Sequence, residues 1–382
     1  MSEMALILNQ VPKLVFGEDA LSAAAGHLQS LGVQRPFVVA APSAAGKARL
    51  LHPHASVDVT TRAEPTVDHF HRLLETAREC RPDAVAGIGG GSALDVAKVV
   101  AVLCSGEQTL DEVWGIGNVK GRSLPLICLP TTSGTGSEVS PNALLLDEST
   151  QRKKAVISPY LVPDAAFIDP ALTLTVPAPV TAATGLDALT HCIEAYANRF
   201  AHPLVDTWAL DGIRHIAAHL VTAVREPANL EARAHVALGS LYGGLCLGPV
   251  NTAAVHALSY PLGSRHHIAH GHSNAILLPH VLRFNVPAAF GRYAEVALAL
   301  GVSPQSSGEL TAEEGINHLW RLIGETGLEM RLSALRIPES EIPTLAAEGL
   351  AVTRLMRNNI RPISQAQAED IYRAAYSGRW NL

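Results

Sequence analysis

Short apolar runs alternate with helical stretches in the first part of the chain. Buried strands are predicted at residues 35–42, 83–88, 124–130 and 165–170, where Val, Ile, Leu and Ala dominate and glycine, proline or charged residues form the boundaries. The second run leads through glycines into a predicted helix at 92–103. Strands that alternate with helices are typical of βαβ units, so the pattern predicts a parallel sheet.

The pattern changes after a proline-containing segment at residues 172–179, which resembles a linker. Beyond it, strand-like runs nearly vanish, and the tail at 311–382 predicts helices with polar faces and no candidate chemistry. We therefore expect an α/β domain at residues 1–176 and an all-α domain at 177–382. Apolar residues recur at helical spacing in four clear segments: 183–198, 204–224, 230–246 and 290–300.

Composition narrows the class of protein. With 48% hydrophobic and 17% charged residues, the 382-residue chain is typical of a folded globular protein long enough for two domains. A net charge of −6 and the lack of a basic run argue against nucleic acid or an anionic membrane as the main partner. Apolar stretches are far shorter than a bilayer span, and the N-terminus lacks signal-peptide features. Five scattered cysteines favour free thiols, so we expect a cytoplasmic protein.

A glycine-rich turn, Gly-Gly-Gly-Ser at 89–92, joins the second strand to its helix. Such a turn lets backbone N–H groups approach an anion, and the helix N-terminus adds a favourable dipole, as in pyrophosphate binding. The spacing is neither G-x-G-x-x-G, because Leu94 occupies the third glycine position, nor a P-loop. A tight turn capped by Ser92, with Asp95 as a surface acid that compensates the dipole, is the alternative interpretation.

A second polar loop, Pro-Thr-Thr-Ser-Gly-Thr-Gly-Ser-Glu at 130–138, follows the third strand. Hydroxyls and free amides at the carboxyl edge of a parallel sheet suit ribose, phosphate or carboxamide recognition. The alternative is a helix start capped by serine or threonine and supported by Glu138. Lys153 and Lys154 follow shortly and can either reach a phosphate or remain a solvated pair. Two polar loops at neighbouring strand ends favour a nucleotide site.

Four residues of the helical half can bind one divalent metal ion. Asp187 and His191 lie at i and i+4, which places both side chains on one helix face. His256 and His270 supply two further imidazoles. One carboxylate with three imidazoles suits Fe²⁺, Zn²⁺ or Ni²⁺ and suits Ca²⁺ or Mg²⁺ poorly.

Most of the 17 histidines must have ordinary roles. His267 and His280 are candidates for the surroundings of the metal or of a substrate, whereas His266 and His272 are interpreted as ordinary. Glu194, one turn after His191, can orient a ligand or lie on an exposed helix face.

Taken together, the motifs resemble the iron-containing (group III) alcohol dehydrogenase family over most of the chain. The resemblance implies a metal site in the cleft between an N-terminal dinucleotide domain and a helical domain. It also implies NAD- or NADP-dependent interconversion of a small alcohol and its aldehyde or ketone, by hydride transfer assisted by Fe²⁺ or Zn²⁺, in a homodimer. The motifs are Gly89-Gly90-Gly91-Ser92-x-x-Asp95-x-x-Lys98, Pro130-Thr131-Thr132-x-Gly134-Thr135, residues 183–191, and His256 fourteen residues before His270-Gly271.

Site residues follow from the same resemblance. The metal ligands would be Asp187, His191, His256 and His270. The cofactor site would be lined by Gly90, Gly91, Ser92, Asp95, Thr131, Thr132, Thr135 and Lys153.

Two departures from the family pattern limit what carries over. Many members have an acidic residue after the first predicted strand, where this chain has Ala41 followed by Pro42 and Ser43, so the choice between NAD and NADP stays open. Tyr260 occupies a position that is often histidine. Tyrosine can donate a proton or bind a substrate, although its ordinary pKa near 10 makes it a different acid. The proton would leave through solvent, through cofactor hydroxyls or through a residue of the cleft such as Tyr260 or His267, and the sequence leaves these routes open.

Three alternatives remain. Maleylacetate reductases are close relatives that also lack the acidic residue, but they tend to have asparagine where this chain has Asp187. A non-redox enzyme like the dehydroquinate synthases would show more basic phosphate-binding residues. A catalytically silent nucleotide-binding scaffold would not need the complete set of ligands. The physiological substrate and the direction of the reaction cannot be predicted.

Overall fold

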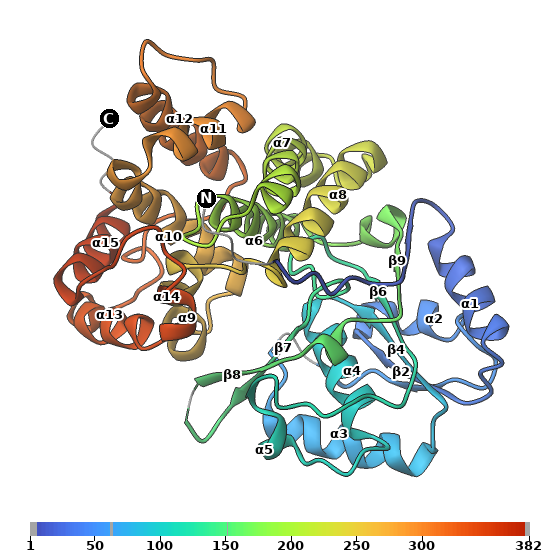
Figure 1. The fold of residues 1–382 in the computed structure, drawn as a ribbon. Coiled ribbons are helices and arrows are strands. Elements are labelled where there is room, and N and C mark those ends of the chain that lie inside the picture. The colour runs from blue at the N-terminus through green and yellow to red at the C-terminus, as the bar shows by residue number, and fades with distance from the viewer. Residues whose placement is uncertain (1–5, 62–63, 151, 379–382) are drawn as a thin grey trace. The chain divides into compact units, whose positions relative to one another are not determined.

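The computed structural model describes residues 6–61, 64–150 and 152–378. The chain divides into two compact units, an α/β unit at Ile7–Thr175 and a helical unit built on Val176–Leu382. Figure 1 shows the first in blue to green and the second in green to red. The expected fold class, a parallel α/β domain followed by a helical region, is confirmed.

The α/β unit is built on a six-stranded sheet in which all neighbours pair in parallel, in the order β1-β9-β6-β4-β2-β3. The four predicted strands are present as β2, β4, β6 and β9. The two edge strands β1 and β3 escaped prediction because they are short and not fully buried. The strands are β1 (Lys13–Phe16), β2 (Pro36–Ala40), β3 (Ser56–Asp58), β4 (Ala84–Gly89), β6 (Leu126–Pro130) and β9 (Ala165–Ile168).

Both faces of this sheet are covered by helices. Along β2, Phe37 and Val39 join the core that includes α3 and α4, whereas Val38 and Ala40 join the core that includes α1 and α2. A strand buried on both sides reads as a continuous apolar run, which explains why the central strands were predictable. The helices are α1 (Ala20–Ser30), α2 (Ala45–Ala48), α3 (Val67–Cys80) and α4 (Gly91–Leu103).

A small second sheet in this unit is absent from the predicted pattern. Strands β7 (Asn142–Asp147) and β8 (Arg152–Ile157) pair antiparallel, and β5 (Gly115–Ile116) lies beside β8. The charged start of β8, Arg-Lys-Lys, hides the strand signal. The short elements of the unit are η1 (Pro42–Ala44), α5 (Leu110–Val113), η2 (Pro159–Leu161) and η3 (Pro170–Thr173).

The helical unit packs around α6 (Ala178–Tyr196), which is buried from Thr181 to its end except at Thr184. Helices α7, α8 and α10 pack against it. The predicted linker at 172–179 contains the end of η3 and the first residues of α6. The other helices are α7 (Pro203–Arg225), α8 (Leu230–Leu247), α9 (Ala254–His266), α10 (His270–Asn285), α11 (Phe290–Ala299), α12 (Gly308–Glu325), α13 (Ile342–Leu350), α14 (Thr353–Met356) and α15 (Gln365–Ser377), with 3₁₀ turns η4 (Val286–Ala288) and η5 (Glu339–Glu341).

Two further observations bear on the class of protein. Within the described ranges, no helix combines the length and apolar character needed to cross a lipid bilayer. All five cysteines are free thiols, and Cys128, Cys192 and Cys246 are buried.

Candidate functional site

The candidate metal ligands on α6 lie one helical turn apart. The helix begins after Pro177 with proline in its first turn, where the missing N–H costs no hydrogen bond. Asp187 and His191 follow at i and i+4 and are both buried. A carboxylate in such an interior needs polar or ionic partners, because burial without them is costly.

Close packing of α10 against α6 brings a third candidate ligand to the same place. A Cβ atom on Gly271 would lie 2.0 Å from the carbonyl oxygen of Ala183 and 3.0 Å from Cβ of Asp187. Only glycine permits this approach. His270 therefore enters the site at the first turn of α10, and the glycine after it has a packing role.

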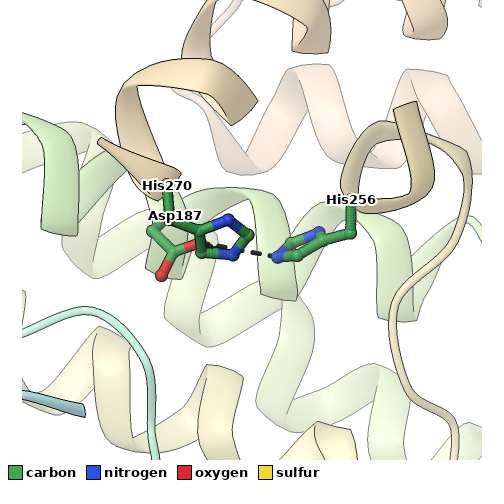
Figure 2. A group of neighbouring side chains, drawn as sticks. All are labelled: Asp187, His256 and His270. Atoms are coloured by element: carbon green, nitrogen blue, oxygen red, sulfur yellow. Dashed lines mark ion pairs between the residues drawn. The ribbon is translucent and has the colours of Figure 1, made fainter. Parts of the chain in front are cut away.

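Three imidazoles converge on one oxygen, Oδ1 of Asp187. The Nε2 atoms lie 3.4 Å away for His256, 3.6 Å for His270 and 3.8 Å for His191. Figure 2 shows the first two rings around the carboxylate. Ligand atoms about 2.1 Å from a tetrahedral metal ion are about 3.4 Å from one another, so these spacings fit a divalent cation.

The rings of His191 and His256 are stacked, with centroids 4.7 Å apart and planes 17° apart. The donor atoms of Asp187, His256 and His270 all lie within 4.8 Å of one another. Asp187, His256 and His270, from three helices, therefore meet in the helical unit, and His191 lies beside them, 3.8 Å from Oδ1 of Asp187 and stacked on His256. Their oxygen and nitrogen donors suit Fe²⁺ or Zn²⁺.

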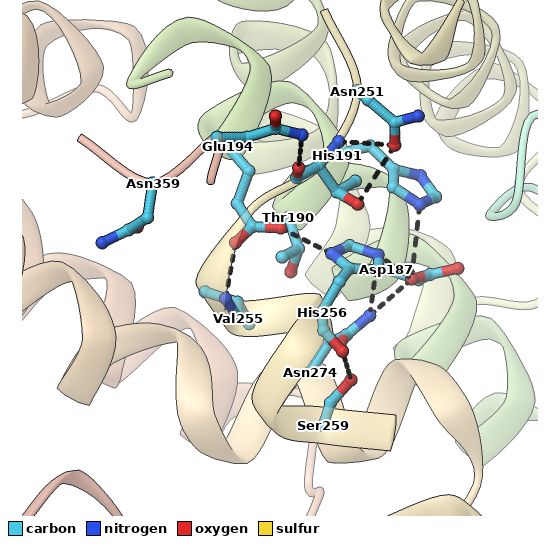
Figure 3. A network of polar contacts seen from close by, with 12 residues as sticks. Asp187, Thr190, His191, Glu194, Asn251, Val255, His256, Ser259, Asn274 and Asn359 are labelled. Atoms are coloured by element: carbon cyan, nitrogen blue, oxygen red, sulfur yellow. Dashed lines mark hydrogen bonds and ion pairs between the residues drawn. The ribbon is translucent and has the colours of Figure 1, made fainter. Parts of the chain in front are cut away.

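Glu194 holds the outer side of His256. Its Oε2 atom lies 2.6 Å from Nδ1 of His256, and its Oε1 atom accepts a hydrogen bond from the backbone N–H of Val255 at 2.6 Å (Figure 3). Histidines that bind metals usually donate their outer N–H to such a carboxylate. Glu194 is buried, so the structure supports its role as an orienter and not as an exposed helix-face carboxylate.

The pKa values of His256 and Asp187 are shifted by their neighbours in this cluster. Burial by itself would lower the pKa of His256, but hydrogen bonds with Asp187 and Glu194 outweigh it and raise that pKa to about 10. Burial would likewise raise the pKa of Asp187, yet His191, His270 and His256 hold it well below its usual range. The cluster thus favours positive charge between its carboxylates, as a divalent cation requires.

A buried asparagine lies at the centre of the cluster, although no motif in the sequence marks it. Nδ2 of Asn274 donates to Oδ1 of Asp187 over 2.7 Å. The same nitrogen lies 3.2 Å from Nε2 of His256 (Figure 3). It also lies 3.5 Å from Nε2 of His270. The one signal in the sequence is its i+4 spacing from His270, which places both side chains on one helix face.

Tyr260 lies beside the cluster. Its ring centroid is 5.7 Å from that of His270, and its Oη accepts a hydrogen bond from Nη2 of Arg354 over 3.2 Å. Arg354 belongs to the tail at 311–382, so a residue of the tail contacts one of the site candidates. His267 is placed differently, since it is the exposed C-cap of α9, and none of the contacts described for it reaches the cluster.

Other histidines of this segment have partners elsewhere. His266 pairs with Glu341 at 3.1 Å, and Nε2 of His272 lies 2.7 Å from a backbone carbonyl, which agrees with their interpretation as ordinary residues. His280 packs edge-on against Trp320. Burial, and to a smaller extent the positive charge of Arg283, lowers the pKa of His280 to about 4.

In the α/β unit, the glycine turn and the threonine loop are packed against each other. They follow β4 and β6, which are neighbouring parallel strands. A Cβ atom on Gly91 would lie 2.5 Å from Cγ2 of Thr135, and one on Gly90 would lie 3.1 Å from Oγ1 of Thr132. The prediction of two polar loops at neighbouring strand ends is confirmed, and glycine is needed for their contact.

The first turn of α4 has no side-chain cap. The N-cap residue is Gly90, so the interpretation of Ser92 as the cap is wrong. Ser92 is instead the second residue of the helix and is half-buried. N–H groups at the start of such a helix are suited to bind an anion.

Asp95 joins the end of the threonine loop to β7 by two hydrogen bonds. Its carboxylate accepts hydrogen bonds from Oγ of Ser137 at 2.5 Å and from the backbone N–H of Leu144 at 3.0 Å. Its interpretation as a surface acid is therefore wrong. The buried Lys98 donates to two backbone carbonyls after the loop, each at 2.9 Å. Thr131, at the start of the loop, is buried.

Both lysines of β8 are paired. Nζ of Lys153 lies 2.8 Å from Oε1 of Glu64, and Nζ of Lys154 lies 2.7 Å from Oδ2 of Asp147. The side chain of Lys153 is only 13% exposed, so its interpretation as a solvated lysine is wrong, whereas that of Lys154 is 40% exposed. A phosphate contact by Lys153 would require it to leave or share this ion pair.

Comparisons with known proteins cover nearly the whole chain. The model of the iron-containing alcohol dehydrogenases matches residues 12–170, and the C-terminal model of the Fe-containing alcohol dehydrogenase family matches residues 181–376. Long-chain-alcohol dehydrogenase 1 of Geobacillus thermodenitrificans is 39% identical over 329 residues, which are 85% of this chain and 82% of the relative.

Solved structures show the same fold. A 1,3-propanediol oxidoreductase superposes with a TM-score of 0.94 at 29% identity, over 98% of this chain and 100% of the other. The sulfoacetaldehyde reductase of Bifidobacterium kashiwanohense, solved in complex with NAD⁺, superposes with a TM-score of 0.88 at 27% identity, again over 98% and 100% of the chains.

Proposed function

Since this chain belongs to the iron-containing alcohol dehydrogenase family and is an oxidoreductase that acts on alcohols, we propose that it interconverts a small alcohol and its aldehyde or ketone with NAD(P) and a bound Fe²⁺ or Zn²⁺. The observation that carries the metal requirement is the convergence of three Nε2 atoms on Oδ1 of Asp187. The intact carboxylate also favours this function over that of a maleylacetate reductase.

Asp187, His191, His256 and His270 would hold the cation. When bound, the cation supplies Lewis-acid polarisation of a substrate oxygen, and the nicotinamide supplies the redox chemistry. Glu194 keeps the ring of His256 turned so that Nε2 faces Asp187. The cluster is largely buried, which limits its access to water and strengthens electrostatic interactions within it.

We assign proton transfer to Tyr260. Because Arg354 donates a hydrogen bond to Oη of Tyr260, the hydroxyl proton points away from the guanidinium and can be donated to a substrate oxygen. His267 is exposed at the end of α9, so we assign it no part in this transfer.

The glycine turn and threonine loop would bind the nicotinamide cofactor. The uncapped start of α4 supports pyrophosphate binding near Gly90, Gly91 and Ser92. Thr131, Thr132 and Thr135 would line the neighbouring part of the site, positioned by Asp95, with Lys153 at its edge. This strand order places both loops at the carboxyl edge of the sheet, the usual place for such ligands.

The choice of coenzyme follows from the end of β2. This strand ends at Ala40 and continues into Ala41 and Pro42, so no carboxylate there repels a 2′-phosphate. We propose that the enzyme accepts both NAD and NADP. The relative solved with NAD⁺ supports the first of these.

We also propose a homodimer in the cytoplasm. The family resemblance implies the dimer, and five free cysteines support a reducing compartment. Size-exclusion chromatography with light scattering would measure the oligomeric state, and a monomeric mass would contradict the dimer.

The test compares metal content with turnover. Oxidation of NADH and NADPH is measured with short aldehydes and ketones before chelation, after chelation, and after restoration of Fe²⁺ or Zn²⁺. We expect one metal ion per chain and activity that follows the metal. The variant His270→Ala should lower kcat/KM more than about 100-fold, whereas His266→Ala, a neighbour outside the cluster, should not. Activity that ignores both chelation and His270→Ala would overturn the proposal.

A further inference from the structure

Arg354 is a half-buried cation in contact with the residue assigned to proton transfer. Its Nη2 atom donates to Oη of Tyr260 over 3.2 Å. Among the described residues, no carboxylate lies within ion-pair distance of its guanidinium. A guanidinium has five N–H donors in a rigid fork. The single contact with Tyr260 therefore leaves most of this hydrogen-bonding capacity for another group.

Tyr260 places this cation close to the candidate metal centre. The tyrosine ring lies 5.7 Å from the ring of His270, measured between centroids, and the planes are tilted by 49°. The guanidinium is thus separated from a metal-ligand candidate by one phenol ring.

Buried asparagines fix the segment that carries Arg354. Nδ2 of Asn358 donates to the carbonyl of Thr252, just before α9, over 2.8 Å. Asn359 exchanges two side-chain hydrogen bonds, of 2.8 and 2.9 Å, with Asn285 at the end of α10.

A third anchor joins this segment to α6. The backbone N–H of Arg199, just after α6, donates to the carbonyl of Asn358 over 2.9 Å. The helices that carry the metal-ligand candidates therefore also position the segment of Arg354. Such anchoring holds a side chain near its working geometry before the ligand binds.

We infer that Arg354 is an anion subsite and that the substrate is a short aldehyde or ketone that carries a carboxylate. The inference rests on the proposed function and names its substrate class. Planar carboxylates match the fork of a guanidinium and form two charge-assisted hydrogen bonds with it. In the overall reaction, the oxo acid, NAD(P)H and one proton give the hydroxy acid and NAD(P)⁺. Tyr260 keeps its contact with Arg354 and positions the guanidinium.

The test uses a matched pair of substrates on the metal-loaded enzyme: 4-oxobutanoate and its neutral methyl ester. Wild-type enzyme should show a kcat/KM at least about tenfold higher for the acid, because a charge-assisted hydrogen bond is worth roughly 1.5–3 kcal/mol. Arg354→Met should lower the value for the acid about 10- to 100-fold more than that for the ester, because both substrates lose the contact of Arg354 with Tyr260 but only the acid loses its ionic partner. Arg354→Lys, which keeps the charge but loses the fork, should fall in between.

A binding measurement separates recognition from turnover. Titration calorimetry of 4-hydroxybutanoate into the metal-loaded enzyme should show weaker binding for Arg354→Met, and the loss should shrink at high salt. The control is Arg357→Met, which removes an exposed arginine at the C-cap of α14 and should change neither readout.

Three results would overturn the inference. The first is a wild-type preference for the ester. The second is an equal loss on both substrates in Arg354→Met, which would show a purely structural role through Tyr260. The third is hydroxy-acid binding that is unchanged in this variant. Failure to reduce any carbonyl with metal restored would instead refute the proposed function, and calorimetry would still decide whether Arg354 binds carboxylates.

Discussion

Glu194 and His256 form a buried pair in which Oε2 of the carboxylate lies 2.6 Å from Nδ1 of the imidazole. The other carboxylate oxygen accepts the backbone N–H of Val255, so neither side chain can turn without breaking a hydrogen bond. The pair fixes which ring nitrogen faces Asp187. Glu194, which is not itself a ligand candidate, thereby orients the imidazole of the ligand candidate His256.

The first prediction concerns this pair. Glu194→Gln keeps the size of the side chain but removes its charge, so His256 becomes a weaker and less firmly oriented ligand. We expect metal affinity to fall about 10- to 100-fold, measured by competition with a chromophoric chelator. Glu313→Gln, an exposed change on α12, is the control. Unchanged affinity in Glu194→Gln would show that the carboxylate does not act on the metal.

Asn274 gives a second prediction, for the chelator-treated protein. Asn274→Ala removes the hydrogen bond to Oδ1 of Asp187 and leaves that buried carboxylate less well paired. The free energy of unfolding should decrease by about 1–3 kcal/mol, measured by urea denaturation. Asn274→Asp adds a second carboxylate beside Asp187, so it should destabilise the chelated protein further and gain more stability when metal is added. Two variants with wild-type midpoints would contradict the role of this amide.

The third prediction concerns Glu138, which is buried in the α/β unit near Lys98. Burial raises the pKa of Glu138 to about 7, although its own backbone amide and Lys98 oppose the shift. The folded state therefore binds a proton that the unfolded chain releases from pH 4.5 upward. Its stabilising contribution is lost as pH rises from about 4.5 to about 7.

Glu138→Gln should remove this loss. We expect the midpoint of thermal unfolding to change less between pH 5 and 7.5 in the variant than in wild type. Glu75→Gln, an exposed change on α3, should keep the wild-type dependence. A variant with the same pH dependence as wild type would refute the assignment.

For three histidines where α7 packs against α8, we expect the opposite dependence of stability on pH. The ring centroids of His219 and His235 are 3.9 Å apart, and Nδ1 of His215 lies 2.9 Å from Nδ1 of His235. Burial, and after it the proximity of His235, lowers the pKa of His219, and burial also lowers that of His215. Because both folded pKa values lie below 6.5, the unfolded chain binds more protons and stability decreases as pH falls below 6.5.

The variant His219→Gln relieves this crowding and should lose less stability than wild type between pH 7 and 5. Urea midpoints at the two pH values provide the measurement. His71→Gln, on an exposed position of α3, is the matched control. Equal losses in His219→Gln and wild type would argue that the stacked rings do not titrate in this range.

Local patterns were enough to predict much of the architecture. The central strands β2, β4 and β6 are buried on both faces, so each is a continuous apolar run that can be recognised without its neighbours. The strands at the sheet edges and the β7–β8 pair are short, partly exposed or charged. Their identity as strands depends on the partner that completes their hydrogen bonds, and that partner is distant in the sequence.

The candidate metal site shows the same division. Asp187 and His191 share a helix face, and the four-residue spacing by itself determined that their side chains lie together. His256 and His270 were selected through the family resemblance, since nothing local relates them to α6. The contact that joins them to Asp187 depends on the close approach of Gly271 to Ala183.

The sequence by itself therefore determined the elements that local patterns specify. These are the buried strands, the long helices, and the glycine and threonine loops after neighbouring strands. Only the tertiary structure decided which polar side chains face one another, as with Asn274 on Asp187, Glu194 on His256 and Arg354 on Tyr260. The physical reason is that helix and strand periodicity arises from hydrogen bonds between near neighbours and from which face is buried. Polar pairing across helices depends instead on packing of the whole unit, which brings together residues as distant in the sequence as Arg354 and Tyr260, 94 positions apart.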